Sequence, residues 1–557
     1  MKILINLKNN DNIILGGSMK KKSLIICLSI IIILSSIFVL RTSYFQGHDL
    51  DFHLSRIISI KDCIGMKRIC YVAPKYLNGY GYGTPLFYPE LFLIFPAILL
   101  YLGFPLSISY RIFIFSINAL SILSMFYSVK RIIKDDKKAI LSSFLYAFTS
   151  YRVIDLTTRG ALGEALSFMF FPLVILGIYE IVYGDYKNYK YLILGMSGVL
   201  LCHILSSIIV FIYLVIFCLI NIKRLFKDKN RIKYLLISTL ITFLLTSYFT
   251  LPMLEQLFSS HYRASIETST LSYRAMPFYH IFLESSFAQL IDGSKWIWSP
   301  GTVGTVYIII IVLYIVSLTM KNKYTSFLNQ SMIISIFFIL LTTKLFPWDA
   351  FQHVLYFLQF PWRFNMIPAM ILPFISSTII DKFKNSNNLI IFMVIVIGII
   401  SIESVTVFKN TKYVDKNNYN DYDIMFGEYL PVSTNEYYIN NRKLIVSNNK
   451  DLEFNYERED NTLYINFKNN TEDTSLELPY IYYKGYSAYI NSKKLDTYEG
   501  KHGLVSIDVD KKYKEGKIKI FYEGTPLQKV TRYISILTLA IGIFFYAKKS
   551  KIKQQNV

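Results

Sequence analysis

Long apolar runs separated by short clusters of Lys and Arg dominate the chain. Twelve of these runs come near the roughly 20 residues that an α-helix needs to cross a bilayer. They span residues 23–40, 107–129, 139–154, 165–183, 190–203, 204–222, 234–252, 302–320, 327–345, 364–381, 389–408 and 530–547. The pattern predicts a mainly α-helical, polytopic membrane protein with about twelve transmembrane helices.

The basic clusters predict how these helices are oriented. Lys20, Lys21 and Lys22 precede the first run, and the cytoplasmic loops of membrane proteins carry an excess of Lys and Arg. Alternating crossings from a cytoplasmic N-terminus place the later clusters inside as well, at residues 130–138, 223–233, 321–323, 381–384 and 548–553. We therefore expect a cytoplasmic N-terminus at 1–22 and a cytoplasmic basic tail at 548–557. Residues 1–18 do not read as a signal sequence, and we expect Met19 as an alternative start to Met1.

Two segments decide whether this scheme holds. Residues 86–104 are apolar, but Pro85, Pro89 and Pro96 interrupt them, and a crossing here would invert every later cluster. A helix interrupted by proline is tolerated in a membrane mainly where protein or water covers it, so we predict a re-entrant or membrane-lying helix on the outer side. Residues 190–222 read as one long helix or as two short ones around His203, and the basic loop that follows favours two.

The polar segments between the spans predict an exterior surface made of loops and one small domain. A transmembrane domain over 23–408 would carry exterior loops at 41–85, 151–164, 253–301 and 345–364. In the region 409–529, segments such as TLYINF and KIKIFY alternate between polar and apolar residues and are separated by Asn, Asp and Gly. This alternation is typical of antiparallel strands and predicts an exterior β-sandwich.

Composition supports the membrane assignment. The 557 residues are 53% hydrophobic and 17% charged, and the mean hydropathy of +0.38 excludes a soluble globular enzyme. The formal charge of +21 lies in clusters between apolar runs, so we assign it to membrane topology and expect no nucleic-acid partner. Five cysteines form no disulfide framework; Cys63 and Cys70 could pair outside, although seven residues on one helix would hold them too far apart.

The first exterior loop carries the most informative group of ionisable residues, GHDLDFHLSR at 47–56. A helix that begins near Asp49 places Asp49, His53 and Arg56 on one face, whereas Asp51 points elsewhere. A carboxylate beside an imidazole and a guanidinium is a candidate general base. The alternatives are an interfacial helix with an Asp cap and a solvated polar face, or a divalent cation held by Asp49 and substrate phosphates. The His and Asp spacing matches no closed zinc site, so we assign no metal ligand.

Cations for an acidic ligand come from other loops. The sequence RGALGE provides Arg159 and Glu164, and FPWRF provides Trp362 and Arg363. Two arginines at one outer cavity suit a phosphate group, with Lys75 as a third candidate; the alternatives are a structural ion pair and an interfacial Trp anchor. The loop 253–301 has no motif, but we expect it to shape acceptor choice through its ionisable residues His261, Arg263, Arg274, His280 and Glu284.

Several of these segments together resemble a known family. GHDLDFH, TPLFYPEL, SYRVIDLTTRGALGE, LQFPWRF and FGEYLP resemble the bacterial 6-pyruvoyl-tetrahydropterin-synthase-related membrane proteins, and LPYIYYKGYSAYINSKK resembles the exterior domain of a neighbouring membrane glycosyltransferase family. The pterin name does not carry function here, because that soluble zinc enzyme needs a three-histidine site that this sequence does not supply. The architecture is similar to the GT-C glycosyltransferase superfamily.

This resemblance implies a polyprenyl-phosphate sugar as donor, transfer on the outer leaflet, and an acidic residue in the first exterior loop. That residue is Asp49 or Asp51, and helix phase favours Asp49. We therefore expect an inverting glycosyltransferase of the bacterial cytoplasmic membrane that modifies an envelope glycan, lipid or protein. Asp49 would be the base, with His53 beside it, and the substrate-binding residues would be Arg56, Lys75, Arg159, Glu164, Trp362, Arg363 and Glu428.

Two other functions remain open. A non-catalytic membrane protein that handles or transports lipid-linked polysaccharide would keep the arginines but need no base. A solute transporter would place its charges in the middle of the membrane and show repeated broken helices, and the sequence shows neither.

Overall fold

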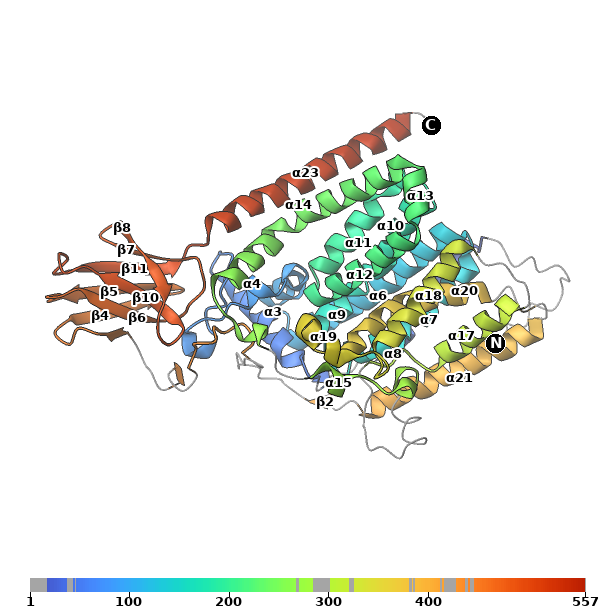
Figure 1. Ribbon diagram of the computed structural model, residues 1–557, viewed down its shortest axis with the longest axis horizontal. Helices are drawn as coiled ribbons and strands as arrows, with labels where there is room; N and C mark the ends of the chain where they lie inside the picture. The colour runs from blue at the N-terminus through green and yellow to red at the C-terminus, as the bar shows by residue number, and fades with distance from the viewer. Residues whose placement is uncertain are drawn as a thin grey trace.

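The computed structural model describes residues 18–37, 44–45, 47–266, 270–283, 301–319, 325–379, 383, 386–410, 413–414, 427–435, 439–440 and 445–555. A bundle of helices and a β-sandwich at one end of it make up the molecule (Figure 1). The α-helices are α2 (Lys21–Ser35), α3 (Leu50–Gly65), α4 (Thr84–Phe87), α5 (Ile94–Tyr101), α6 (Leu106–Ile133), α7 (Asp136–Ala147), α8 (Ser150–Leu156), α9 (Leu162–Ser167), α10 (Phe171–Val182), α11 (Lys190–Leu200), α12 (Ile204–Ile220), α13 (Ile222–Lys227), α14 (Lys229–Ser259), α15 (Leu271–Arg274), α17 (Val306–Thr319), α18 (Ser326–Leu341), α19 (Trp348–Leu355), α20 (Met366–Ile379), α21 (Ser386–Asn410) and α23 (Pro526–Gln555).

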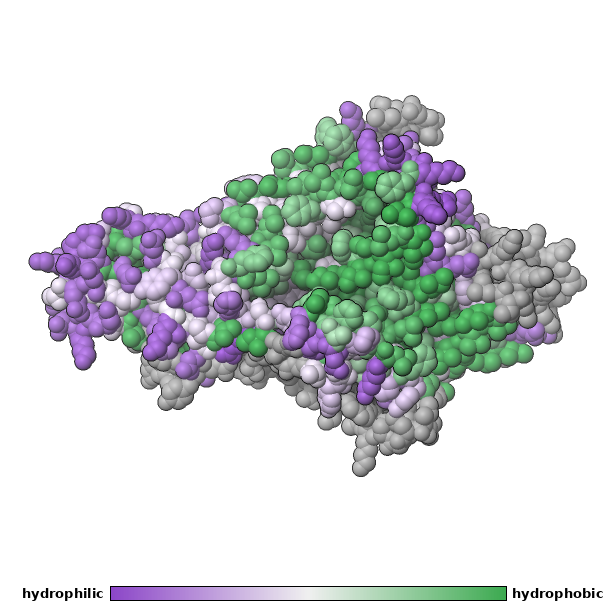
Figure 2. Space-filling view, viewed as in Figure 1, coloured by the Kyte–Doolittle hydropathy of each residue, from purple (hydrophilic) through white to green (hydrophobic). Residues whose placement is uncertain are grey.

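Helices occupy each of the twelve predicted spans, but the count of twelve crossings is not confirmed. Among the described residues, four helices are long and apolar enough to cross a membrane by themselves: 106–133, 229–259, 387–407 and 526–548. Other predicted spans are shorter or broken; residues 139–154 form α7 and α8, and residues 165–183 form the end of α9 followed by α10. Figure 2 shows an apolar band over the bundle, between a polar sandwich and a polar opposite end.

The basic clusters gather at the end of the bundle that is remote from the sandwich. The Met19 amide donates to Asp136 at 2.9 Å, and Lys130 pairs with the same carboxylate at 2.7 Å. The Lys190 ammonium lies 5.2 Å from the Tyr546 ring near the C-terminal end of α23, and Figure 1 places α13 at this end too. This arrangement fits the predicted topology, although the cytoplasmic location of this end stays a prediction. The predicted start at Met1, the cluster 321–323 and the charged residues of the cluster 381–384 lie outside the described residues.

The two uncertain segments have defined structures. Residues 190–222 form two helices, α11 and α12, with His203 as the cap between them. The Tyr183 hydroxyl donates to Asn221 at 2.7 Å, so α12 returns to the end of the bundle where α11 begins, and the two-helix interpretation is confirmed. In the segment 86–104, the main helix is α5, whose eight residues reach only about 12 Å, too short to cross a bilayer.

The C-terminal region contains the predicted β-sandwich. Its strands are β3 (Val446–Ser447), β4 (Glu453–Glu459), β5 (Thr462–Lys468), β6 (Thr474–Ile481), β7 (Tyr486–Ile490), β8 (Lys493–Leu495), β9 (Thr497–Glu499), β10 (Leu504–Val509) and β11 (Gly516–Tyr522). They form two antiparallel sheets, ordered β3-β6-β10-β9 and β4-β5-β11-β7-β8. Alternate side chains of both sheets share one apolar core, as in β5, where Leu463, Ile465 and Phe467 point inward.

The segment between α3 and α5 packs into this same core and thereby fixes the sandwich next to α3. Tyr82, Phe87 and Tyr262 belong to the sandwich core cluster. The Phe87 ring stacks on Tyr429 at 5.0 Å, and the Tyr483 hydroxyl donates to the Tyr429 carbonyl at 3.0 Å. A two-stranded ribbon of β1 (Tyr44–Phe45) and β2 (Tyr413–Val414) adds a second link between distant parts of the chain. The aromatic contacts join segments from four parts of the sequence, near residues 82–87, 262, 429 and 483, at the sandwich core.

Candidate active site

Asp49 is the residue immediately before α3, at the end of the bundle that faces the sandwich. Its backbone is fixed, because its N–H donates to the Arg159 carbonyl at 2.9 Å and its own carbonyl accepts from His53 N–H at 3.1 Å. Its carboxylate makes no capping bond and has no hydrogen-bond partner among the described residues. Burial raises the pKa of Asp49, and the positive charges of Arg159 and Arg363 oppose that rise. The half-buried carboxylate is therefore near two guanidinium groups and free to accept a proton.

A buried ion cluster lies beside Asp49. The Glu164 carboxylate accepts two hydrogen bonds from Arg159, at 2.9 and 3.0 Å, and one from the Tyr151 hydroxyl at 2.7 Å. Arg159 also pairs with Asp155 one helical turn before it. This bidentate geometry suits a structural ion pair, the alternative that the sequence left open. Three of the five Arg159 N–H groups are bonded to these two carboxylates, and the guanidinium also contributes positive charge beside Asp49.

Arg363 completes the cluster from a distant loop. Its Nε donates to Glu164 at 2.9 Å, and its Nη1 donates to the Leu358 carbonyl at 2.7 Å and to the Gln359 side chain at 2.8 Å. Its Nη2 has no hydrogen-bond partner among the described residues. The predicted meeting of Arg159, Glu164 and Arg363 near Asp49 is thus found in the structure.

Glu428 approaches from the segment that leads into the sandwich. Its carbonyl accepts from the Ala264 amide at 2.7 Å, and the next residue is held by the Tyr82 hydroxyl, which accepts from Tyr429 N–H at 3.1 Å. Burial raises the pKa of Glu428, Arg363 lowers it, and the negative charge of Asp49 raises it further. Two half-buried carboxylates, Asp49 and Glu428, therefore share the field of Arg363.

Tyr88 stands among these groups and was missed by the sequence analysis as a site residue. Its hydroxyl is influenced by the charges of Asp49, Glu164 and Arg363, and burial raises its pKa far above the ordinary value. This hydroxyl comes so close to Gly163 that a Cβ there would lie 2.1 Å from the oxygen. The glycine inside RGALGE is the sequence signal that an aromatic hydroxyl approaches the helix.

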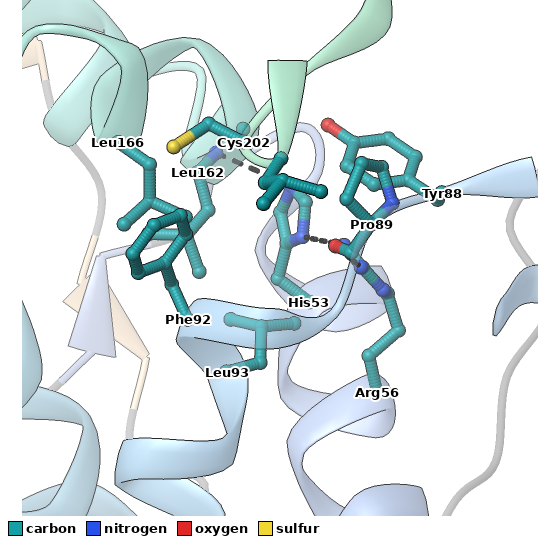
Figure 3. A pocket seen from close by; sticks show the side chains of 11 residues that line it. His53, Arg56, Tyr88, Pro89, Phe92, Leu93, Leu162, Leu166 and Cys202 are labelled. Atoms are coloured by element: carbon teal, nitrogen blue, oxygen red, sulfur yellow. Dashed lines mark hydrogen bonds between the residues drawn. The ribbon is translucent and has the colours of Figure 1, made fainter. Parts of the chain in front are cut away.

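His53 and Arg56 form a separate, closed pocket next to the site (Figure 3). The Arg56 guanidinium lies 4.2 Å from the Tyr88 ring and donates to the Pro89 carbonyl at 2.6 Å. It also donates to His53 Nδ1 at 3.2 Å, while the Leu162 amide points at Nε2 from 3.2 Å. Both ring nitrogens therefore face donors, and burial lowers the pKa of His53 well below its usual value.

The sequence-based role of His53 is thus corrected. Its side chain is only 2% exposed and does not contact the Asp49 carboxylate, because Asp49 precedes the helix whereas His53 turns toward the pocket. A protonated imidazole would carry an N–H on both ring nitrogens, and these would point at the N–H donors of Arg56 and Leu162. His53 and Arg56 therefore position Tyr88 and the 88–90 turn, and the pocket itself is too narrow to hold a water molecule.

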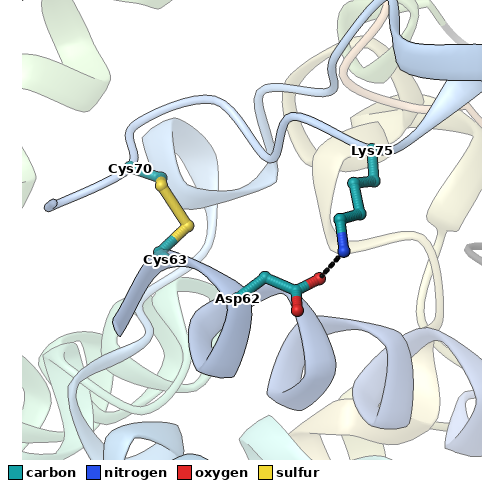
Figure 4. Close-up of a disulfide and its surroundings, with 4 residues drawn as sticks. All are labelled: Asp62, Cys63, Cys70 and Lys75. Carbon is teal, nitrogen blue, oxygen red and sulfur yellow. Dashed lines mark ion pairs between the residues drawn. A yellow bond between two sulfur atoms is a disulfide. The ribbon is translucent and has the colours of Figure 1, made fainter. Parts of the chain in front are cut away.

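Lys75 does not join the site. Its ammonium pairs with Asp62 at 2.9 Å near the far end of α3, about 20 Å along the helix from Asp49 (Figure 4). The same view shows the Cys63–Cys70 disulfide, with Cα atoms 5.9 Å apart. The possible pairing of these two cysteines is therefore confirmed, against the expectation that one continuous helix would hold them too far apart. That expectation is wrong, because α3 ends at Gly65 and Lys67 adopts a positive φ of 55° that reverses the chain.

Trp362 and Arg274 border the site on its other side. The Trp362 ring stacks on Phe360 at 4.1 Å, and Arg274 places its guanidinium 4.5 Å from the same Phe360 ring. The sequence placed Arg274 only in a loop without a motif, and Glu284 of that loop lies outside the described residues. The described residues contain no group of three His, Cys, Asp or Glu side chains that could hold a metal ion, and a cation shared by Asp49 and substrate phosphates stays a prediction.

Comparison with known proteins gives the chain a family. A protein of Lactococcus lactis subsp. cremoris (strain MG1363), described as an uncharacterized protein, is 22% identical over 594 aligned residues that cover 95% of this chain and 96% of the relative. The family model described as bacterial membrane protein YfhO matches residues 78–432, a range that includes Arg159, Glu164, Arg363 and Glu428 but begins after Asp49. The name of the 6-pyruvoyl-tetrahydropterin-synthase-related family receives no support from these comparisons. Because the matched range covers more than half of the sequence, the chain belongs to the bacterial membrane protein family YfhO.

Proposed function

We propose that this protein is an inverting membrane glycosyltransferase that moves a sugar from a polyprenyl-phosphate donor to a hydroxyl of a cell-envelope acceptor. The observation that carries the proposal is the free, half-buried carboxylate of Asp49 beside the Arg159–Glu164–Arg363 cluster. A carboxylate that is held in place and lacks a partner can take a proton from an acceptor hydroxyl. The GT-C-like architecture and YfhO membership agree with this reaction class.

The reaction balances with the groups present. The acceptor oxygen forms a bond to the sugar C1, the bond from C1 to the phosphate oxygen breaks, and the hydroxyl proton passes to Asp49. The donor phosphate changes from a diester with one negative charge to a monoester with two. Positive charge placed where this second charge develops lowers the barrier, and Arg363 can supply it through its Nη2, which no described residue occupies.

The other predicted residues take supporting roles in this proposal. Glu164 fixes Arg159 and Arg363, while Glu428 and the Tyr88 hydroxyl, which both lie in the field of Asp49 and Arg363, would orient the acceptor. Lys75 is not among the substrate-binding residues of this proposal, because its ion pair with Asp62 lies far from Asp49. Transfer on the outer leaflet follows from the predicted orientation, in which the sandwich end is exterior.

Profiling of lipid-linked sugars in cells tests the proposal against the non-catalytic alternative. A deletion strain is expected to accumulate a polyprenyl-phosphate sugar, and wild-type protein is expected to clear it. A strain carrying Asp49→Asn is expected to accumulate the same lipid at normal protein level in the membrane. Clearance by Asp49→Asn would favour a protein that handles lipid-linked polysaccharide without chemistry.

A further inference from the structure

Arg274 and Arg363 approach one aromatic ring from two loops. Their guanidinium carbons lie 4.5 Å and 5.1 Å from the centroid of Phe360. Phe360 in turn stacks on Trp362 at 4.1 Å with an interplanar angle of 14°. Guanidinium groups are attracted to aromatic faces, but two of them on one ring also repel each other. The arrangement therefore concentrates positive charge beside a rigid aromatic pair.

The positive charge of Arg274 has no counter-charge among the described residues. Its one hydrogen bond is from Nη1 to the Gln359 carbonyl at 3.3 Å, and no carboxylate pairs with it. Arg363 shares its carboxylate, Glu164, with Arg159. Arg274 is half-buried, and both its burial and the charge of Arg363 lower its pKa. A half-buried positive charge that lacks a carboxylate partner and lies near a second guanidinium is costly, and a bound anion would relieve that cost.

Gln359 joins the two arginines. Its side-chain oxygen accepts from Arg363 at 2.8 Å, and its carbonyl accepts from Arg274. Gln359 makes both hydrogen bonds from a backbone conformation with a φ of 63° and a ψ of −40°, which non-glycine residues rarely adopt. Such conformations persist where surrounding structure imposes them, and they are concentrated at ligand and active sites.

An exposed apolar surface lies next to these arginines. The Leu271 amide at the start of α15 donates to the Gln352 side chain of α19 at 2.7 Å, so the two helices are joined. Around them, large apolar side chains point outward, and we call this set the apolar apron: Tyr273 (82% exposed), Leu345 (77%), Val354 (68%) and Phe351 (42%). A ligand with a phosphate head and a hydrocarbon chain would match both features at once.

We propose that Arg274 and Arg363, held by Gln359 and Phe360, form the binding site for the phosphate of a prenyl lipid, whose chain lies on the apolar apron. The inference rests on the proposed glycosyltransferase function and assigns its leaving-group site to Arg274 rather than to Arg159 or Lys75. The prenyl phosphate that leaves carries two negative charges, whereas the donor carries one. Two guanidinium groups therefore bind the leaving group more strongly than the donor and favour cleavage.

Binding of farnesyl phosphate to the purified full-length protein in detergent tests this site. Farnesol and inorganic phosphate are the comparison ligands, and Arg68→Gln is the matched control because it removes an exposed arginine that makes no ion pair among the described residues. We expect Arg274→Gln to weaken farnesyl phosphate binding at least about tenfold, Arg274→Lys to weaken it less, and Arg68→Gln to leave it unchanged. Equal affinity of wild type and Arg274→Gln for farnesyl phosphate would overturn the inference.

The comparison ligands separate the sources of the phosphate and the two proposals. Inorganic phosphate binding as tightly as farnesyl phosphate would contradict the lipid assignment, because the apron would then contribute nothing. Arg274-dependent binding without any sugar transfer would leave this site standing and remove the proposed function. If sugar transfer depended on Asp49 but the affinity for farnesyl phosphate did not depend on Arg274, the proposed function would stand and this binding site would be rejected.

Discussion

At the scale of single residues, the raised pKa of Asp49 predicts how activity depends on pH. A base must be ionised, and burial raises the pKa of this carboxyl above its ordinary 3.8, so donor consumption should fall on acidification at a pH above that value. Arg363 lowers this pKa, so Arg363→Gln should reduce the rate and move the acid limb to higher pH, with Arg68→Gln as control. A pH–rate profile measures both effects, and an acid limb that does not move would contradict the placement of Arg363 near the base.

Gly163 offers a second residue-scale prediction. A Cβ at this position would lie 2.1 Å from the Tyr88 hydroxyl and 3.2 Å from the Cys202 carbonyl, so Gly163→Ala must displace Tyr88 from the site. We expect donor consumption to fall at least about tenfold, which corresponds to ~1.4 kcal/mol of lost transition-state stabilisation. Gly398→Ala is the control, because a Cβ there meets no atom within 4 Å. Equal activity of the two variants would exclude a role for Tyr88.

The sequence predicted part of this site. Asp49, Arg159, Glu164 and Arg363 could be found because each is an ionisable residue close to the end of an apolar run. The partners of a side chain could not be found in this way, because they depend on contacts between distant loops. Arg159 therefore pairs with Asp155, which the sequence did not single out, as well as with Glu164, and His53 turns away from Asp49.

At the scale of secondary structure elements, Glu403 connects α21 to the rest of the bundle. Its carboxylate accepts from the Thr305 amide at 2.6 Å and from the Ser150 hydroxyl at 3.2 Å, which ties α21 to the starts of α17 and α8. Glu403→Ala would leave these donors buried without a partner, at a cost of about 1–3 kcal/mol. Thermal unfolding in detergent should show a clearly lower midpoint. Ser401→Ala on the same helix, whose hydroxyl bonds only within its own turn, should change the midpoint little.

The positions of the helices were predictable, but their breaks were not. Apolar runs mark the twelve helical regions because burial or lipid contact requires them. The breaks between α7 and α8, and between α9 and α10, depend on tertiary contacts such as the bond from the Tyr146 hydroxyl to the Phe168 carbonyl at 2.6 Å. The disulfide was misjudged for the same reason, since one left-handed residue after α3 decides where Cys70 lies.

At the scale of the whole molecule, the gathering of basic clusters at one end predicts the topology. A cysteine at exposed Asp496 in the sandwich should react with an impermeant maleimide on intact cells. A cysteine at exposed Lys134, within the 130–138 cluster, should react only after permeabilisation. Labelling of both positions on intact cells would contradict the separation of the two ends by the membrane. Labelling of position 134 alone would reverse the orientation and move the site to the cytoplasmic side.

The joining of the sandwich to the first exterior loop could not be predicted. The strands follow from their alternation, but the aromatic contacts between Phe87, Tyr262, Tyr429 and Tyr483 link residues hundreds of positions apart. Nothing local in the sequence distinguishes these rings from an interfacial aromatic belt. Their packing is what brings Glu428 to within the influence of Asp49 and Arg363.

Consumption of a polyprenyl-phosphate sugar by the purified protein, compared between Asp49→Asn and Asp51→Asn, shows whether Asp49 is the base. Asp51 lies two residues further on, in the first turn of α3, and was the alternative base. We predict that Asp49→Asn lowers the rate by about 10²–10⁴-fold while Asp51→Asn keeps most of it. Near-normal consumption by Asp49→Asn, or loss in Asp51→Asn alone, would contradict the account.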